Sequence, residues 1–167
     1  AHTLTLAADQ AYGIAKRKDA AAADFNGDGV IDLKSEMVFG PAYYAAAFDR
    51  SGSKSTNYLN TIMQAYMDGR MLITAANGAI LTNEQRLSLK GYASIIESNW
   101  ELVLAEATFK YAGSVYKDIV KMSEEGADKD KIYRAYVKHW GELKGFSMAL
   151  QSGRNNLGEV AAKMNEL

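Results

Sequence analysis

The sequence predicts an all-α protein, an antiparallel bundle of helices. The chain contains one Pro, 7 Met and 10 Tyr, with few runs of Val, Ile and Thr, and this composition favours helix over sheet. Apolar residues recur at spacings of three and four along most of its length, which is the period of a helix with one buried face. Gly and Asn residues separate the periodic segments. We therefore expect helices joined by short loops.

Length, charge and cysteine content limit the possible functions. The 167 residues, 48% of them hydrophobic, suffice for one core, so we expect a single domain over residues 1–167. The net charge is −1 and Lys and Arg are spread along the chain, which predicts neither a nucleic-acid partner nor binding to an anionic membrane. No apolar run reaches the about 18 residues of a membrane span. The absence of Cys excludes disulfides, iron–sulfur centres and thiol catalysis.

Residues 4–23 form the first predicted helix, and the segment after it has the pattern of a calcium-binding loop. Oxygen-bearing side chains alternate from Asp24, Gly29 at the sixth position allows a sharp turn, and Ile31 at the eighth position points into the protein. This spacing is typical of EF-hand and dockerin loops. The predicted calcium ligands are Asp24, Asn26, Asp28, the Val30 carbonyl, Asp32 and Glu36.

The loop departs from the EF-hand pattern at its twelfth position. Ser35 stands where a bidentate Glu is usual, and Glu36 follows one residue later. The loop can therefore close through Ser35 or through Glu36, and we interpret it as a structural calcium site. The alternative is an acidic turn between two helices, because Asn, Asp and Gly are also ordinary turn residues.

Short segments follow the loop. Residues 33–39 are expected to form a helix that Gly40 and Pro41 end, because Pro is tolerated only in the first turn of a helix. Residues 41–48 restart a helix. The polar stretch 49–55, with its Gly and Ser residues, is predicted to be a connecting loop.

Residues 56–76 form the next predicted helix, which Asn77 and Gly78 end. A stripe containing Met could be an adaptable binding surface or a soft metal site, but we interpret it as core, which flexible Met side chains fill well. Its members are Leu59, Ile62, Met63, Tyr66, Met67, Leu72 and Ile73.

A capping box at residues 82–85, Thr-Asn-Glu-Gln, begins a long helix that we expect to end with Gly126 as a left-handed cap. Glu106 falls within its apolar stripe, and a carboxylate on a buried face is costly unless it is paired or bound to a cation. Glu106 is therefore a candidate ligand, and the alternative is a contact with a Lys or Tyr at a helix crossing. The stripe, predicted to be buried, comprises Ile95, Ile96, Leu102, Val103, Phe109, Gly113, Tyr116 and Val120.

Asp128 or Asp130 is predicted to cap the following helix, and a last helix covers residues 155–167. The apolar stripe of the capped helix contains His139, and Glu142 lies three residues later on the same side. Such a pair can hold a metal ion, as Glu-x-x-His pairs do in ferritin-like bundles. A di-iron site is excluded, because His2 is the only other histidine. The alternative is a core histidine hydrogen-bonded to a carboxylate.

Known catalytic patterns are absent from the sequence. It contains no H-E-x-x-H, no G-x-S-x-G, no P-loop and no dinucleotide-binding fingerprint. We therefore assign no catalytic residue and no organic cofactor, and we favour a protein that is not an enzyme.

The run Lys138-His139-Trp140-Gly141-Glu142-Leu143-Lys144-Gly145-Phe146 resembles the imelysin-like group of bacterial extracytoplasmic helical-bundle proteins. In that group a G-x-H-x-x-E motif is the proposed metal-binding feature, and Val137 stands here in place of its Gly. The continuation to Gln151 is similar to an uncharacterised family of secreted or lipid-anchored bacterial proteins. The resemblance covers about residues 56–167 and implies metal binding at His139 and Glu142 and a link to iron uptake.

Two functional hypotheses follow. The first is an exported metal-binding protein that holds a metal ion, such as iron or zinc, or a metal complex at His139 and Glu142, with Glu106 as a candidate third ligand, and a structural calcium ion in the loop. The second is a calcium-stabilised interaction module of a larger surface protein, without a small-ligand site. Both predict the periplasm or cell surface, where calcium is plentiful enough to fill an irregular loop. Since the sequence begins at Ala1, an export signal or lipid anchor would precede it.

Overall fold

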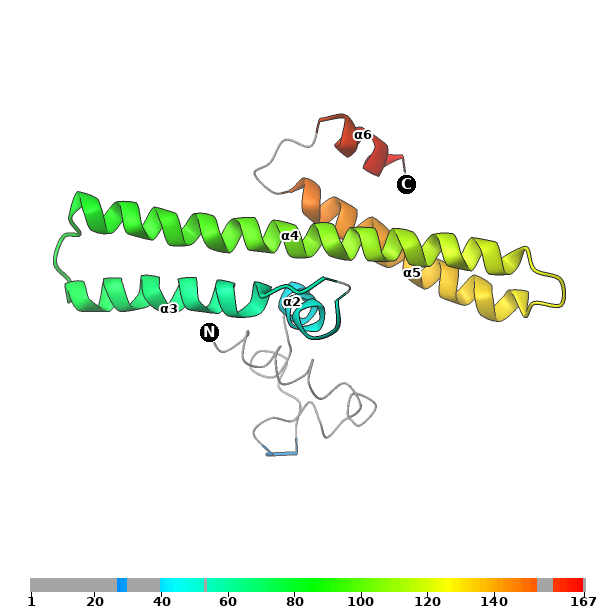
Figure 1. The fold of residues 1–167 in the computed structure, drawn as a ribbon, viewed down its shortest axis with the longest axis horizontal. Helices are drawn as coiled ribbons and strands as arrows, with labels where there is room; N and C mark the ends of the chain where they lie inside the picture. Colours follow the sequence, from blue (N-terminus) through cyan, green and yellow to red (C-terminus); the bar gives the residue numbers. More distant parts are fainter. Residues whose placement is uncertain (1–26, 30–39, 53, 153–157, 167) are drawn as a thin grey trace. The chain divides into compact units, whose positions relative to one another are not determined.

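The structure is a computed structural model that describes residues 27–29, 40–52, 54–152 and 158–166. These residues form five helices and no strand (Figure 1), which confirms the all-α prediction for this part of the chain. The predicted helices at residues 4–23 and 33–39 lie outside the described residues. The five helices are α2 (Gly40–Ser51), α3 (Tyr58–Ala76), α4 (Asn83–Met122), α5 (Lys129–Gln151) and α6 (Glu159–Asn165).

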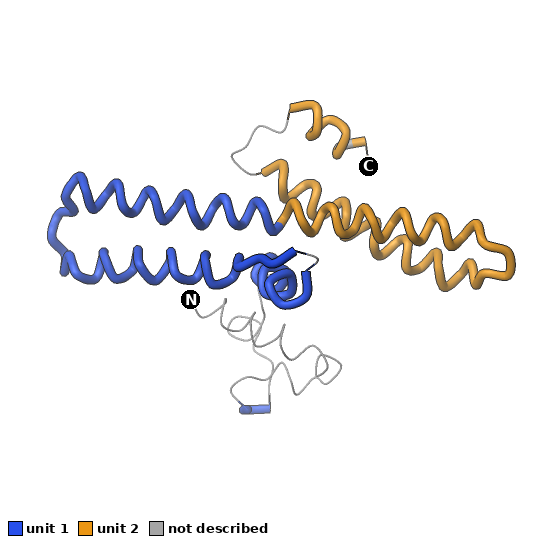
Figure 2. The backbone as a smooth tube through the Cα atoms, viewed as in Figure 1, with its two compact units in different colours: residues 1–103 blue, residues 104–167 orange. Residues whose placement is uncertain are grey.

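The chain divides into two compact units, residues 1–103 and residues 104–167 (Figure 2). The first contains α2, α3 and the beginning of α4, and the second contains the rest of α4 with α5 and α6. The single domain expected from the sequence stays a prediction.

In the first unit, Asp49 of α2 caps the beginning of α3. Its carboxylate accepts hydrogen bonds from the Thr56 hydroxyl and from the backbone N–H groups of Tyr58 and Leu59, each at 2.7 Å. Asn57, the residue in the cap position, makes no capping bond with its own side chain. Asp49 therefore satisfies free N–H groups of α3 and places a negative charge at its positive end. The stretch predicted as a loop is thus partly helical and carries a specific contact.

Replacing Asp49 with Ala should lower the free energy of unfolding by about 2 kcal/mol, since three bonds to a charged acceptor are lost at a helix N-terminus. Asp49→Asn should retain part of this stability. Asp68→Ala is the matched control, because Asp68 accepts an exposed bond from Gln64 one turn away at 2.8 Å, and it should cost less than about 0.5 kcal/mol. Urea denaturation measures all three. Equal losses for Asp49→Ala and Asp68→Ala would contradict the capping role.

Small residues dominate the buried surface of the first unit. Ala42, Ala45 and Ala46 of α2 are fully buried, as is Ile62 of α3, while Leu59 and Ala65 are nearly so. Further along α3, Gly69 is buried beneath Leu89 and Tyr92 of α4, whose Cδ2 atoms lie 3.6 and 3.7 Å from the point that a Cβ atom on Gly69 would occupy. The close approach of α3 and α4 therefore depends on small side chains at the contact.

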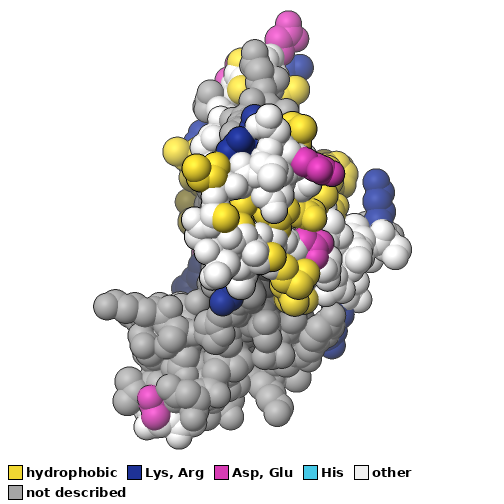
Figure 3. Space-filling model, turned by 90° about the vertical axis from the view of Figure 1, so that its left-hand side faces the viewer, with side chains coloured by type: hydrophobic (Ala, Val, Ile, Leu, Met, Phe, Trp, Pro, Cys, Tyr) yellow, Lys and Arg dark blue, Asp and Glu magenta, His cyan; other side chains and the backbone are white. Residues whose placement is uncertain are grey.

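The Met-containing stripe of α3 is only partly core. Leu59 and Ile62 are buried as predicted, but Met67, Tyr66 and Ile73 are exposed. Hydrophobic side chains are visible at the surface in Figure 3, which views the end of the molecule that carries the α3–α4 connection. The core interpretation was wrong for these residues. Apolar side chains are spread around α3 more widely than the face that packs against neighbouring helices.

The sequence signals at the helix ends are mostly confirmed. The Thr82 N–H donates to Gln85 Oε1 at 2.9 Å and the Gln85 N–H donates to Thr82 Oγ1 at 3.2 Å, which is the predicted capping box. Asn77 ends α3 in the left-handed conformation with φ 46°. Asp128 caps α5 by accepting from the Lys131 N–H at 3.1 Å. The exception is Gly126, which has φ 76° but lies beyond the end of α4 at Met122.

In the second unit, α4 packs on α5 through a face that the sequence analysis did not predict. Ala107, Tyr111 and Asp118 are buried, whereas Phe109 and Tyr116 are 82% and 69% exposed. Tyr111 stacks on Phe146 of α5, with ring centroids 5.8 Å apart and an interplanar angle of 8°. The predicted buried stripe of α4 is therefore exposed in this unit, because the face with small and mixed side chains meets α5. The apolar stripe of α5 that contains His139 does face inward, as predicted. Leu143 is buried, and the other members are half-buried, namely Ile132, Tyr136, His139, Phe146 and Leu150.

Candidate functional site

His139 and Asp118 form a close pair between α5 and α4 in the second unit. The distance from His139 Nδ1 to Asp118 Oδ2 is 2.6 Å, and the side chains are 28% and 9% exposed. The two residues are brought together because α4 and α5 are antiparallel, with residue 118 beside 139 and residue 111 beside 146. The carboxylate therefore fixes the orientation of the imidazole ring and engages its Nδ1 atom.

Aromatic rings surround the pair on one side. The Tyr111 ring centroid lies 6.0 Å from that of His139, with an interplanar angle of 37°, and 5.8 Å from that of Phe146. Tyr111 is also nearly buried. Asp118 and Tyr111 are both buried, so the carboxylate of the pair is poorly solvated, which strengthens the electrostatic component of its bond to His139.

Glu142 lies one helical turn after His139 and carries a buried oxygen atom without a hydrogen-bond partner. Among the described residues, Glu142 Oε2 and Ser147 Oγ are the two buried side-chain atoms in this condition. A desolvated carboxylate oxygen without a donor is costly, and such atoms in native proteins call for an explanation such as an ion or a water molecule. The His139 and Glu142 side chains project from the same side of α5, since they are three residues apart in one helix.

Glu106 is not brought next to His139. It is half-buried on α4, twelve residues before Asp118, which corresponds to about 18 Å along the helix axis. No group of three or more His, Cys, Asp and Glu side chains able to hold a metal ion occurs within the described residues. The site that the structure offers therefore contains two candidate ligands, His139 and Glu142, with Asp118 behind the histidine.

The predicted calcium loop is described only at residues 27–29. Gly27 and Gly29 have φ angles of 75° and 83°, a left-handed conformation that glycine adopts without strain and that tight ligand-binding loops require. Asp28 between them is exposed. The other predicted ligands, Asp24, Asn26, Val30, Asp32 and Glu36, lie outside the described residues.

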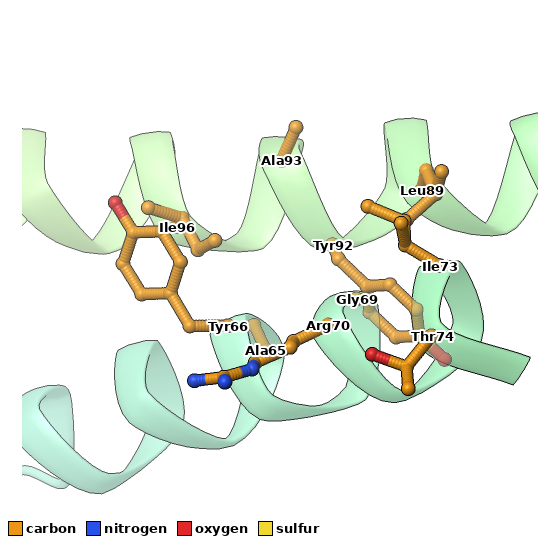
Figure 4. Close-up of a pocket in the computed structure, with 10 residues that line it drawn as sticks. All are labelled: Ala65, Tyr66, Gly69, Arg70, Ile73, Thr74, Leu89, Tyr92, Ala93 and Ile96. Atoms are coloured by element: carbon orange, nitrogen blue, oxygen red, sulfur yellow. The ribbon is translucent and has the colours of Figure 1, made fainter. Parts of the chain in front are cut away.

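A groove between α3 and α4 in the first unit has a mostly apolar lining and a volume of about 360 Å³. Gly69 is one of its lining residues, and Tyr66 of α3 extends toward Ile96 of α4 (Figure 4). Arg70 is the one charged residue in its lining. The groove is open to solvent, and its lining residues include no carboxylate and no histidine, so we assign it no catalytic or metal-binding role.

Comparisons with models of known protein families, with curated proteins and with solved structures find no match for this chain. Within the described residues, no helix is both long enough and apolar enough to cross a membrane. The imelysin-like resemblance therefore stays a prediction that rests on the sequence from Lys138 to Gln151.

The sequence analysis missed Asp118. It lies seven residues after Tyr111, and both are buried on the side of α4 that contacts α5. The sequence did show that Asp118 and Tyr111 share one side of the predicted helix, because they are seven residues apart. That side is opposite the one with the large apolar side chains. The sequence alone does not show how α4 and α5 align, so it could not identify His139 as the partner of Asp118.

Proposed function

We propose that this chain is an exported, imelysin-like helical protein that binds a transition-metal ion or metal complex through His139 and Glu142. The observation that carries the proposal is the hydrogen bond of 2.6 Å between Asp118 Oδ2 and His139 Nδ1. Histidines that bind metals usually donate their second ring N–H to a carboxylate in this way, which fixes the tautomer and makes the other nitrogen a better ligand. The Nε2 atom of His139 would then carry the lone pair for the metal.

Glu142 supplies the second predicted ligand. A cation would give its buried Oε2 atom the partner that it lacks among the described residues, and it would offset the cost of desolvating the carboxylate. One imidazole and one carboxylate suit zinc or iron better than calcium, which prefers oxygen ligands alone. Two protein ligands leave coordination positions for water or for a chelating molecule that accompanies the metal. We therefore favour an ion that keeps some of its own ligands when bound.

The calcium loop has a separate, structural role in this proposal. Bound calcium would neutralise the acidic side chains around Asp28 and connect the helix predicted at residues 4–23 to the rest of the chain. The positive φ angles of Gly27 and Gly29 support a tight turn at the centre of the loop. A calcium-dependent loop also supports a location outside the cytoplasm, in the periplasm or at the cell surface.

Replacing Glu142 with Gln should separate binding from stability. In metal-free protein Glu142→Gln should leave stability unchanged or raise it by up to about 1 kcal/mol, because a carboxylate with one buried oxygen that lacks a partner among the described residues becomes a neutral amide. Zinc should raise the melting temperature of the wild type and have a much smaller effect on the variant. Thermal melts with chelator and with zinc, at saturating calcium, measure both effects. A variant that is destabilised without metal and still stabilised by zinc would contradict the ligand role.

The second candidate function is an interaction module, in which His139 is a core residue satisfied by Asp118. Large apolar side chains exposed in both units favour it, among them Ile80 and Leu87 in the first and Phe109 and Tyr116 in the second. Surfaces of this kind mark contacts with other proteins. Equal zinc affinity of the wild type and a His139 variant would leave only this function.

A further inference from the structure

The second unit presents an apolar stripe on α4 that faces away from α5. The stripe consists of Ala105, Phe109, Ala112, Tyr116 and Ile119, all of them exposed. Their spacings alternate between four and three residues, so they lie on one side of the helix as the a and d positions of a heptad do. The buried residues Tyr111 and Asp118, which contact α5, lie on the opposite side.

Small and large side chains alternate along this stripe. Ala105 and Ala112 alternate with the large rings of Phe109 and Tyr116, which are 82% and 69% exposed. If two copies of the stripe meet antiparallel about a point between residues 110 and 111, Phe109 faces Ala112 of the other copy and Tyr116 faces Ala105. Every ring then meets an alanine, which leaves room for it between closely spaced helices. Parallel pairing would set ring against ring and alanine against alanine.

Charge at the edge of the stripe favours the same arrangement. Glu106 and Lys117 lie on one edge, and antiparallel pairing about residues 110 and 111 brings Glu106 within about 3 Å, along the axis, of the level of Lys117 in the other copy. Parallel pairing would instead set this edge against the opposite edge of the other copy, so Glu106 and Lys117 would not meet. The Lys110 ammonium group is turned away from the stripe, since it lies 5.4 Å from the Tyr111 ring centroid on the buried side.

We propose that this stripe of α4 is a self-association surface, and that two copies of the chain pair antiparallel through it. The partner is therefore a second copy of this chain, and the proposal deepens the interaction function named above. Four aromatic rings that bury about 150 Å² each, with the alanines and Ile119 added, give an interface of roughly 1,000 Å². That is the low end for specific complexes, so the dimer should be weak, with a dissociation constant on the order of 10 μM.

Sedimentation equilibrium between about 5 and 300 μM tests the proposal, with the dissociation constant as the readout. Phe109→Ala and Ala112→Phe should each weaken the dimer at least about tenfold, the first by removing the ring and the second by a clash. The double variant, Phe109→Ala with Ala112→Phe, exchanges ring and alanine and should restore the wild-type constant to within about threefold. Tyr133→Ala is the control, because Tyr133 is an exposed ring on α5 outside the stripe and should have no effect.

Orientation is measured independently with a spin label. The chain has no Cys, so Lys121→Cys gives a single labelling site. Antiparallel pairing separates the two labels by about 30 Å along the axis, and parallel pairing holds them within about 20 Å. A wild type that is monomeric at 300 μM, a double variant that does not recover, or the short label distance would each overturn the proposal. Zinc binding is measured separately, so a failure here leaves the metal site untouched.

Discussion

Replacing His139 with Ala should lower the free energy of unfolding by about 2–4 kcal/mol. The Asp118 carboxylate, only 9% exposed, would lose the partner that lies 2.6 Å away, and removing one member of a buried pair leaves an uncompensated charge in a poorly solvated place. The lost contact with the Tyr111 ring adds to the cost. For a chain of 167 residues, this corresponds to a melting temperature lower by about 5–15 °C.

Replacing Asp118, the other member of the pair, should lower the free energy of unfolding by less. Asp118→Ala leaves an imidazole that is 28% exposed and can bond to water, so the expected loss is about 1–2 kcal/mol. The double variant, with Ala at both positions, should be more stable than His139→Ala, because no buried carboxylate remains without a partner. Urea denaturation of the metal-free proteins gives the three values. If the double variant is less stable than either single variant, the two residues contribute independently to the free energy of unfolding, which would contradict a buried pair.

Calcium removal should have the second large effect on stability. If Asp24, Asp28, Asp32 and Glu36 surround one ion, four negative charges repel one another in the calcium-free loop. An ion that binds only the folded state stabilises it by about 2.7 kcal/mol when its concentration is a hundred times the dissociation constant. A chelator should therefore lower the melting temperature by about 5–10 °C.

Two controls separate calcium binding from a general effect of salt. Magnesium should restore little of the stability, because it requires a tighter octahedral shell and keeps its water ligands. Asp28→Ala should remove the response to calcium and leave the helix content measured by circular dichroism nearly unchanged, since Asp28 is exposed. Metal-free protein whose melting curve ignores both calcium and chelator would reduce this segment to an acidic turn.

Local signals predicted the helix boundaries well. The structure places α3 at Tyr58–Ala76, within two residues of the prediction, because Asn77 and Gly78 adopt the left-handed conformations that end helices. The capping box likewise located the beginning of α4. These signals are contained in a few neighbouring residues, so no knowledge of the tertiary structure was needed to read them.

The buried side of α4 could not be read from the sequence in the same way. Its largest apolar residues, such as Phe109 and Tyr116, are exposed, while Ala107 and Asp118 are buried. The large apolar side chains suggested that their face of α4 is buried. The buried face is instead the one that packs against α5. The same limit explains the site. His139 and Glu142 share one helix and were found from their spacing, whereas Asp118 joins them only through the register between α4 and α5.

The most direct test of the metal site is a calorimetric titration of zinc into the wild type and into His139→Asn, with calcium in excess to fill the loop. Asn is chosen because its Nδ2 group can donate to Asp118 in place of imidazole Nδ1 but offers nothing in place of Nε2, so the fold is retained and the ligand is lost. We expect one zinc ion per wild-type chain and at least a tenfold weaker affinity in His139→Asn. Equal affinity and stoichiometry in the two proteins would contradict metal binding at His139.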